Sequence, residues 1–116
     1  ATFTLSDFGR TISNNGDGTD HAWSTINMIV SNASEFDGGK FYGSLPDFTM
    51  GGDDDATSKG RFIPKISVDQ MNASLCNWFG VDDSIMTTLF PNLPNFKTDS
   101  AIDSAYLKKN GTKLFS

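Results

Sequence analysis

The most strongly patterned part of this 116-residue chain is Ser67-Val68-Asp69-Gln70-Met71-Asn72-Ala73-Ser74-Leu75-Cys76-Asn77-Trp78-Phe79-Gly80. Ser67 is a preferred N-cap residue, and Gln70 follows at the spacing of a capping box. Apolar residues then repeat at helical spacing, and Gly80 supplies a left-handed stop. The segment therefore predicts an amphipathic helix of about three turns. Its largest apolar side chains, Met71, Trp78 and Phe79, are expected in the core.

Short extended segments and long polar loops surround this helix. Strands are expected at residues 2–8, 26–30, 40–43 and 61–66, where short apolar runs lie between turn residues. Loops rich in Asp, Asn and Gly are expected at 13–20 and 46–60. A second short helix is expected after Asp82-Asp83-Ser84, with Pro91 ending it, and one further helical turn at 101–107. The predicted fold class is α/β.

Charge and composition exclude several classes of function. The net charge is −5 and only two of the nine basic residues are arginine, so no basic stripe predicts binding to nucleic acid or to an anionic membrane surface. No apolar run approaches the roughly 20 residues that a transmembrane helix needs. Cys76 is the only cysteine, which excludes an internal disulfide and a zinc site built from cysteines.

The acidic residues are unevenly distributed between the two types. The chain has a single glutamate, Glu35, and the other acidic residues are aspartates. Aspartate is typical of helix caps, turns and metal-binding loops. Asp69, Asp82 and Asp83 fit helix starts, and Asp53-Asp54-Asp55 fits a solvated loop tip. Asp7 and Asp20 remain as candidates for chemistry.

The candidate catalytic residues lie in two neighbouring segments, Ser6-Asp7-Phe8-Gly9-Arg10-Thr11 and Gly18-Thr19-Asp20-His21. A strand that ends at Asp7, followed by a loop returning Asp20 and His21, could gather two carboxylates and an imidazole around a divalent cation. Arg10 could then hold an anionic ester oxygen bidentately. The same residues also fit a structural interpretation, in which Asp7 and Arg10 form an ion pair, Asp20 caps a turn and His21 is partly buried.

A different class of function is a calcium-stabilised extracellular binding or structural module. Ser13, Asn15 and Asp17 place oxygen donors at positions 1, 3 and 5 of a calcium loop, with Gly18 at position 6. Ser24 occupies position 12, where a bidentate glutamate is expected. This alternative predicts a non-catalytic protein.

Six motifs occur in an order that resembles a bacterial exported family known as domain of unknown function 1501. They are Thr4-Leu5-Ser6-Asp7-Phe8-Gly9-Arg10-Thr11, Gly18-Thr19-Asp20-His21-Ala22-Trp23, Gly38-Gly39-Lys40-Phe41-Tyr42-Gly43, Ile63-Pro64-Lys65-Ile66-Ser67-Val68-Asp69-Gln70, Trp78-Phe79-Gly80-Val81 and Phe90-Pro91-Asn92-Leu93-Pro94-Asn95-Phe96. The resemblance covers residues 1–96, which look like the carboxy-terminal portion of that family's domain. Residues 97–116 are interpreted as a polar extension.

The family resembles the alkaline phosphatase and sulfatase superfamily, and this implies a partial α/β/α sandwich with divalent metals at strand ends. The resemblance implies Asp7, Asp20 and His21 as ligands of zinc, manganese, magnesium or calcium. It also implies that Arg10 stabilises the oxyanion of a small phosphate or sulfate ester. It further implies a bacterial protein exported to the periplasm or the extracellular space.

The sequence departs from the superfamily pattern at identifiable positions. Phe8 stands where a strand-end motif similar to Ser-Asp-His-Gly would have its histidine, so either Asp7 or the Asp20-His21 pair could correspond to that motif. No segment corresponds to the superfamily's nucleophile, which lies near the amino terminus of a longer chain. The chain is therefore expected to be inactive alone. Its expected partner is the missing amino-terminal part of the domain, or a second copy that pairs with the exposed first strand.

Overall fold

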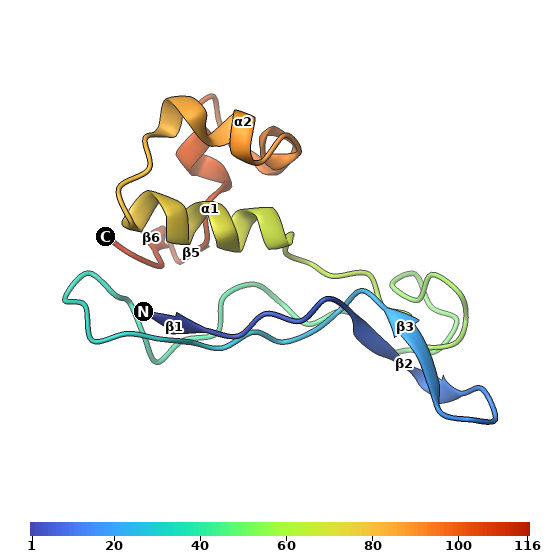
Figure 1. Cartoon of the computed structure of the whole chain (residues 1–116). Helices are drawn as coiled ribbons and strands as arrows, with labels where there is room; N and C mark the ends of the chain where they lie inside the picture. The colour runs from blue at the N-terminus through green and yellow to red at the C-terminus, as the bar shows by residue number, and fades with distance from the viewer. The chain divides into compact units, whose positions relative to one another are not determined.

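The computed structural model describes residues 1–116 as a mixture of short antiparallel strand pairs and helices (Figure 1). The strands are β1 (Thr2–Phe3), β2 (Gly9–Asn14), β3 (Thr19–Ala22), β4 (Ile29–Val30), β5 (Lys108–Lys109) and β6 (Thr112–Lys113). The α-helices are α1 (Val68–Trp78) and α2 (Met86–Leu89), and 3-10 helices occupy Asp83–Ile85, Leu93–Phe96 and Ile102–Ala105. The mixed helix and strand content agrees with the predicted α/β class. The strands form three separate pairs, β1–β4, β2–β3 and β5–β6.

The chain divides into two compact units. The first contains residues 1–31 and 44–65, and the second contains residues 32–43 and 66–116. All four of the first strands belong to the first unit, and all helices belong to the second. None of these helices combines the length and the hydrophobicity needed to cross a membrane.

The sequence predicts the strands of the first unit only in part: β1 and β4 are shorter than expected, and β2 and β3 lie where no strand is expected. The expected strand over 2–8 is limited to β1, and the expected loop over 13–20 contracts to the turn between β2 and β3. β1 pairs antiparallel with β4, which occupies only the end of the expected 26–30 strand. Residues 61–66 contribute a single bridge, between Phe62 and Asp55, and residues 40–43 form no strand. Alternating apolar residues indicate where the chain is extended. How much of it forms a β-strand depends on whether a neighbouring segment is in place to hydrogen-bond with it.

The α1 helix begins as the sequence predicts. The backbone N–H of Asp69 donates to the Ser67 hydroxyl over 3.2 Å, and the backbone N–H of Ser67 donates to Gln70 Oε1 over 3.1 Å. The predicted capping box is therefore confirmed. Gly80 adopts a φ of +101°, a conformation that glycine reaches without the Cβ strain of other residues.

We expect Ser67→Ala to destabilise the second unit by about 1 kcal/mol, because the mutation removes the acceptor for a first-turn N–H group. Urea unfolding followed by circular dichroism at 222 nm measures this change. Ser34→Ala is the matched control, since Ser34 is exposed and lies outside any helix, and it should change the unfolding free energy by less than about 0.5 kcal/mol. Equal effects of both substitutions would contradict a capping role.

The core of the second unit forms where α1 meets the segments that follow it. Its fully or almost fully buried members are Ala73, Met86, Leu93, Ala105 and Tyr106. The Tyr106 hydroxyl donates to Asp83 Oδ1 over 2.6 Å, and burial together with this carboxylate raises the pKa of Tyr106. Polar groups at the core are thus paired, as burial requires.

Residues 97–116, which the sequence suggests are a polar extension, belong to the second unit and bury several apolar side chains. Leu107, Leu114 and Phe115 are buried, in addition to Ala105 and Tyr106. The Ser74 hydroxyl accepts the Leu107 N–H over 2.8 Å, which fixes this segment to α1. The expected helical turn appears as the 3-10 helix Ile102–Ala105.

Phe79 does not belong to the core, although the sequence predicts it there. It is 84% exposed, whereas Met71 is buried and Trp78 is partly buried. Phe79 is the C-cap residue of α1, so its side chain lies beyond the stripe of apolar residues that faces the core.

Asp55 is a second correction. The sequence suggests a solvated loop tip at Asp53-Asp54-Asp55, but Asp55 is only 8% exposed. Asp55 Oδ2 accepts from the backbone N–H groups of Gly51 and Gly60, and Oδ1 accepts from those of Thr57 and Arg61. One carboxylate therefore organises the loop at residues 51–61.

Candidate functional site

The β2–β3 hairpin of the first unit carries most of the residues that the sequence singles out. Figure 1 shows the two strands side by side as a twisted ribbon. Gly9 pairs with Ala22 and Arg10 pairs with His21, in antiparallel register. Because successive side chains of a strand point to opposite faces, the hairpin has two distinct faces.

One face of the hairpin is buried. Gly9, Thr11 and Ala22 lie on it, and a Cβ at Gly9 would collide with the backbone carbonyl of Ser24. The register shifts between Arg10 and Asn14, and the Thr11 hydroxyl compensates by accepting the N–H of Asp20 over 3.0 Å. This packing holds the opposite face outward.

The outward face carries Phe8, Arg10, His21 and Trp23, all exposed. The rings of Phe8 and His21 stack with centroids 3.8 Å apart and an interplanar angle of 19°. The Arg10 guanidinium lies 5.1 Å from the Phe8 ring centroid. Cation–π attraction and ring stacking therefore order three neighbouring side chains on an otherwise open surface.

Arg61 joins this face from the distant loop. Its Nε donates to the backbone carbonyl of His21 over 3.0 Å, and its guanidinium carbon lies 6.0 Å from a ring centroid of Trp23. We call Phe8, Arg10, His21, Trp23 and Arg61 the arginine–aromatic face.

The polar atoms of the arginine–aromatic face remain largely available to a ligand. Arg10 uses one donor, since Nη1 bonds to the Thr19 carbonyl over 2.8 Å, and a guanidinium has five N–H groups. No hydrogen bond of the protein involves the ring nitrogens of His21. The face can thus donate several hydrogen bonds to an anion from fixed positions.

The predicted metal ligands are not gathered into one group. Asp7 lies exposed between β1 and β2, and Asp20 Oδ1 accepts from Asn15 Nδ2 over 2.7 Å. Asp20 and His21 are consecutive in β3, so their side chains lie on opposite faces. No three His, Cys, Asp or Glu side chains of the chain form a group that could hold a metal ion. The structure therefore does not bring Asp7, Asp20 and His21 together as one set of ligands.

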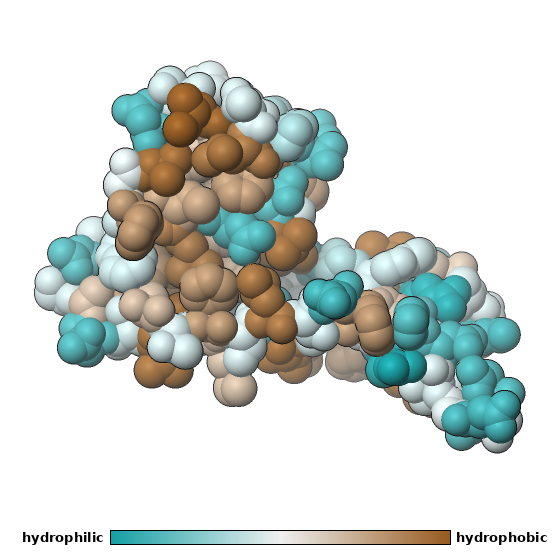
Figure 2. Space-filling view, in the orientation of Figure 1, coloured by the Kyte–Doolittle hydropathy of each residue, from teal (hydrophilic) through white to brown (hydrophobic).

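The residues of the suggested calcium loop form the turn of the hairpin. Asn14 Oδ1 accepts the N–H of Gly16 over 2.6 Å, and Asn15 Oδ1 accepts that of Asp17 over 3.0 Å. The N–H of Asn15 donates to the carbonyl of Gly18 over 2.8 Å. Figure 2 shows this end of the hairpin as a hydrophilic tip. The asparagine oxygens thus stabilise a turn, as Asx residues commonly do.

Sequence reasoning identified Arg10 and His21 but missed their neighbours. Phe8 and Trp23 stand two residues from Arg10 and His21 respectively, so strand alternation could have placed them on the same face. Arg61 is 40 residues from His21, and no local pattern connects them.

Comparisons with protein-family models, with curated proteins and with solved structures find no match to this chain.

Proposed function

We propose that the arginine–aromatic face binds the anionic group of a phosphate or sulfate ester. The chain would be part of a bacterial exported protein, periplasmic or extracellular, similar to the metal-dependent ester hydrolases of the alkaline phosphatase superfamily. The observation that carries the proposal is the direct pairing of Arg10 with His21 on the outward face of the hairpin. Arg61, bonded to the backbone of His21, adds a second guanidinium.

The chemistry of these groups suits a tetrahedral oxyanion. Guanidinium N–H groups form charge-assisted, often bidentate hydrogen bonds with phosphate and sulfate oxygens. Such donors also stabilise the negative charge that accumulates on the equatorial oxygens during ester hydrolysis. Arg10 would act as the oxyanion clamp, and the Phe8 and Trp23 rings beside the two guanidiniums would contact the leaving group.

The chain would provide only this part of a catalytic site, and we propose that it is inactive alone. No three potential metal ligands of the chain form a group, and the divalent ion that the resemblance implies stays a prediction. Large apolar side chains on and near β1 and β4, including Phe3, Leu5, Met28 and Val30, are exposed, and we propose that the rest of a larger domain covers them. No feature of the hairpin turn favours the calcium module over this proposal.

The binding proposal is tested by titrating the full chain with phenyl phosphate and phenyl sulfate, followed by ¹H–¹⁵N NMR. Arg10→Gln should weaken binding about tenfold, because one charge-assisted interaction is removed. Lys109→Gln removes the same charge from β5 in the second unit and should change the Kd less than about twofold. Equal weakening by both substitutions would mean that only net charge matters, and would contradict a site at the hairpin.

A further inference from the structure

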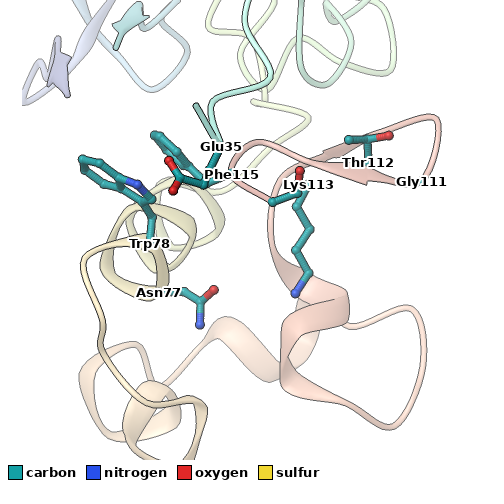
Figure 3. Close-up of a pocket in the computed structure, with 8 residues that line it drawn as sticks. Glu35, Asn77, Trp78, Gly111, Thr112, Lys113 and Phe115 are labelled. Carbon is teal, nitrogen blue, oxygen red and sulfur yellow. The ribbon is translucent and has the colours of Figure 1, made fainter. Parts of the chain in front are cut away.

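The second unit contains a pocket that the proposed function does not use (Figure 3). It has a volume of about 540 Å³, and its wall includes Glu35, Asn77, Trp78, Thr112 and Lys113. These residues come from three separate segments of the second unit. Small-molecule sites are typically concave and combine an apolar wall with a few fixed polar groups.

The wall of this pocket is held in place by backbone and ring contacts. Phe36 and Phe115 form an antiparallel bridge, and the N–H of Ser116 donates to the Glu35 carbonyl over 3.0 Å. The Trp78 and Phe115 rings stack with centroids 4.6 Å apart and an interplanar angle of 17°. The Glu35 backbone and the Trp78 ring are therefore both held against the segment that contains Phe115 and Ser116, although they are 43 positions apart in the sequence.

Of the two charged side chains in the pocket wall, Lys113 has a partner within the protein and Glu35 has none. Lys113 Nζ forms an ion pair with Asp103 over 2.9 Å and lies 5.7 Å from the Tyr106 ring centroid. The Glu35 carboxylate has no hydrogen bond or ion pair within the protein, and Glu35 is exposed. Because Lys113 is paired with Asp103, Glu35 is the unpaired charged side chain of the pocket wall.

A neighbouring polar group supplies an acceptor for an N–H or O–H group of a ligand. Asn77 Nδ2 donates to Asp83 over 2.9 Å, which leaves the Asn77 carbonyl oxygen as an acceptor. Figure 3 shows the Glu35 carboxylate turned toward the Trp78 ring. A carboxylate beside an aromatic ring is a combination that attracts organic cations, through charge pairing and through the negative face of the ring.

We propose that this pocket binds a small organic cation, with an ammonium or quaternary ammonium group placed between the Glu35 carboxylate and the Trp78 ring. The proposal is independent of the ester-binding face, because it rests on residues of the other unit. The chain would then have two binding sites, one for an anionic ester at the hairpin and one for an organic cation at this pocket.

The experiment uses choline as the probe and Trp78 fluorescence as the signal, with Trp23→Phe present in every variant of the full chain. Choline should bind with a Kd on the order of 1 mM. Its uncharged isostere, 3,3-dimethyl-1-butanol, should bind at least about tenfold more weakly, because it lacks the charge that Glu35 and the ring recognise.

Two substitutions complete this test. Glu35→Gln keeps the shape of the side chain and should weaken choline binding about tenfold. Asp53→Asn removes one negative charge from an exposed, unpaired position in the first unit and should leave the choline Kd within about twofold. Equal binding of choline and its isostere, or equal binding by wild type and Glu35→Gln, would overturn the proposal, as would the absence of any signal up to 50-fold above the expected Kd.

Discussion

Leu93→Ala is expected to destabilise the second unit by about 3 kcal/mol, which is a large share of the stability of a small protein. Leu93 is completely inaccessible to solvent and begins the 3-10 helix Leu93–Phe96. The alanine variant loses the transfer free energy of the removed methyl groups and leaves a cavity between α1, α2 and the 102–106 segment. Urea unfolding followed by Trp78 fluorescence, in a Trp23→Phe background, measures the change in the second unit.

Leu89→Ala provides the matched control for this prediction. Leu89 is the last residue of α2 and is 49% exposed, so the same chemical change leaves no closed cavity. We expect it to cost less than about 1 kcal/mol. If Leu93→Ala cost no more than Leu89→Ala, the packing described for the second unit would be incorrect.

Asp55→Asn is expected to open the loop at residues 51–61 in the first unit. Two backbone N–H groups donate to each Asp55 oxygen, and an amide presents an N–H₂ group where one of those oxygens stood. Whichever way the amide is turned, two backbone donors lose their acceptor. Trypsin should then cleave after Lys59 and Arg61 on the order of a hundredfold faster than in the wild type.

The same carboxylate makes the loop sensitive to acid. Burial alone raises the pKa of Asp55, but the four backbone N–H donors outweigh it and hold the pKa at about 2. The unfolded value is about 3.9, so the stabilisation is fully present above about pH 4 and is lost as the pH falls through 2. The amide resonances of Gly51 and Gly60 should report this transition by NMR.

The control for both measurements is Asp53→Asn, because Asp53 is exposed and bonds to none of these backbone groups. Its tryptic cleavage rate and its acid transition should match those of the wild type. Protection that persists in Asp55→Asn would contradict the organising role of Asp55.

The helical part of the fold could be predicted from the sequence because its signals are local. Ser67 and Gln70 form the capping box within four residues, and Gly80 ends the helix where its sequence position suggests. The short helices after Asp82 and Ala101 also appear where their cap and turn residues indicate. These features depend on residues that are neighbours in the chain.

The candidate site could be predicted only in part. An expected strand end at Asp7 and a short polar loop were enough to place Arg10 and His21 in neighbouring segments, but not to fix their register. Asp20 and His21 are consecutive residues of β3, so their side chains lie on opposite faces, but the sequence predicts a loop over 13–20 and did not reveal that Asp20 belongs to a strand. The predicted metal site requires the side chains of Asp7, Asp20 and His21 to point to one place. Which way they point depends on how the strands pair, and the sequence does not show that.

By itself, the sequence determined the capped helix, the acidic and weakly basic charge balance and the presence of Arg10 and His21 in adjacent short segments. The tertiary structure alone decided that Arg61 reaches His21, that Asp55 is buried and that Glu35 and Trp78 line one pocket. The physical reason is distance along the chain. Caps and turns are hydrogen-bonded among a few consecutive residues, whereas these contacts join residues whose proximity depends on the packing of whole segments.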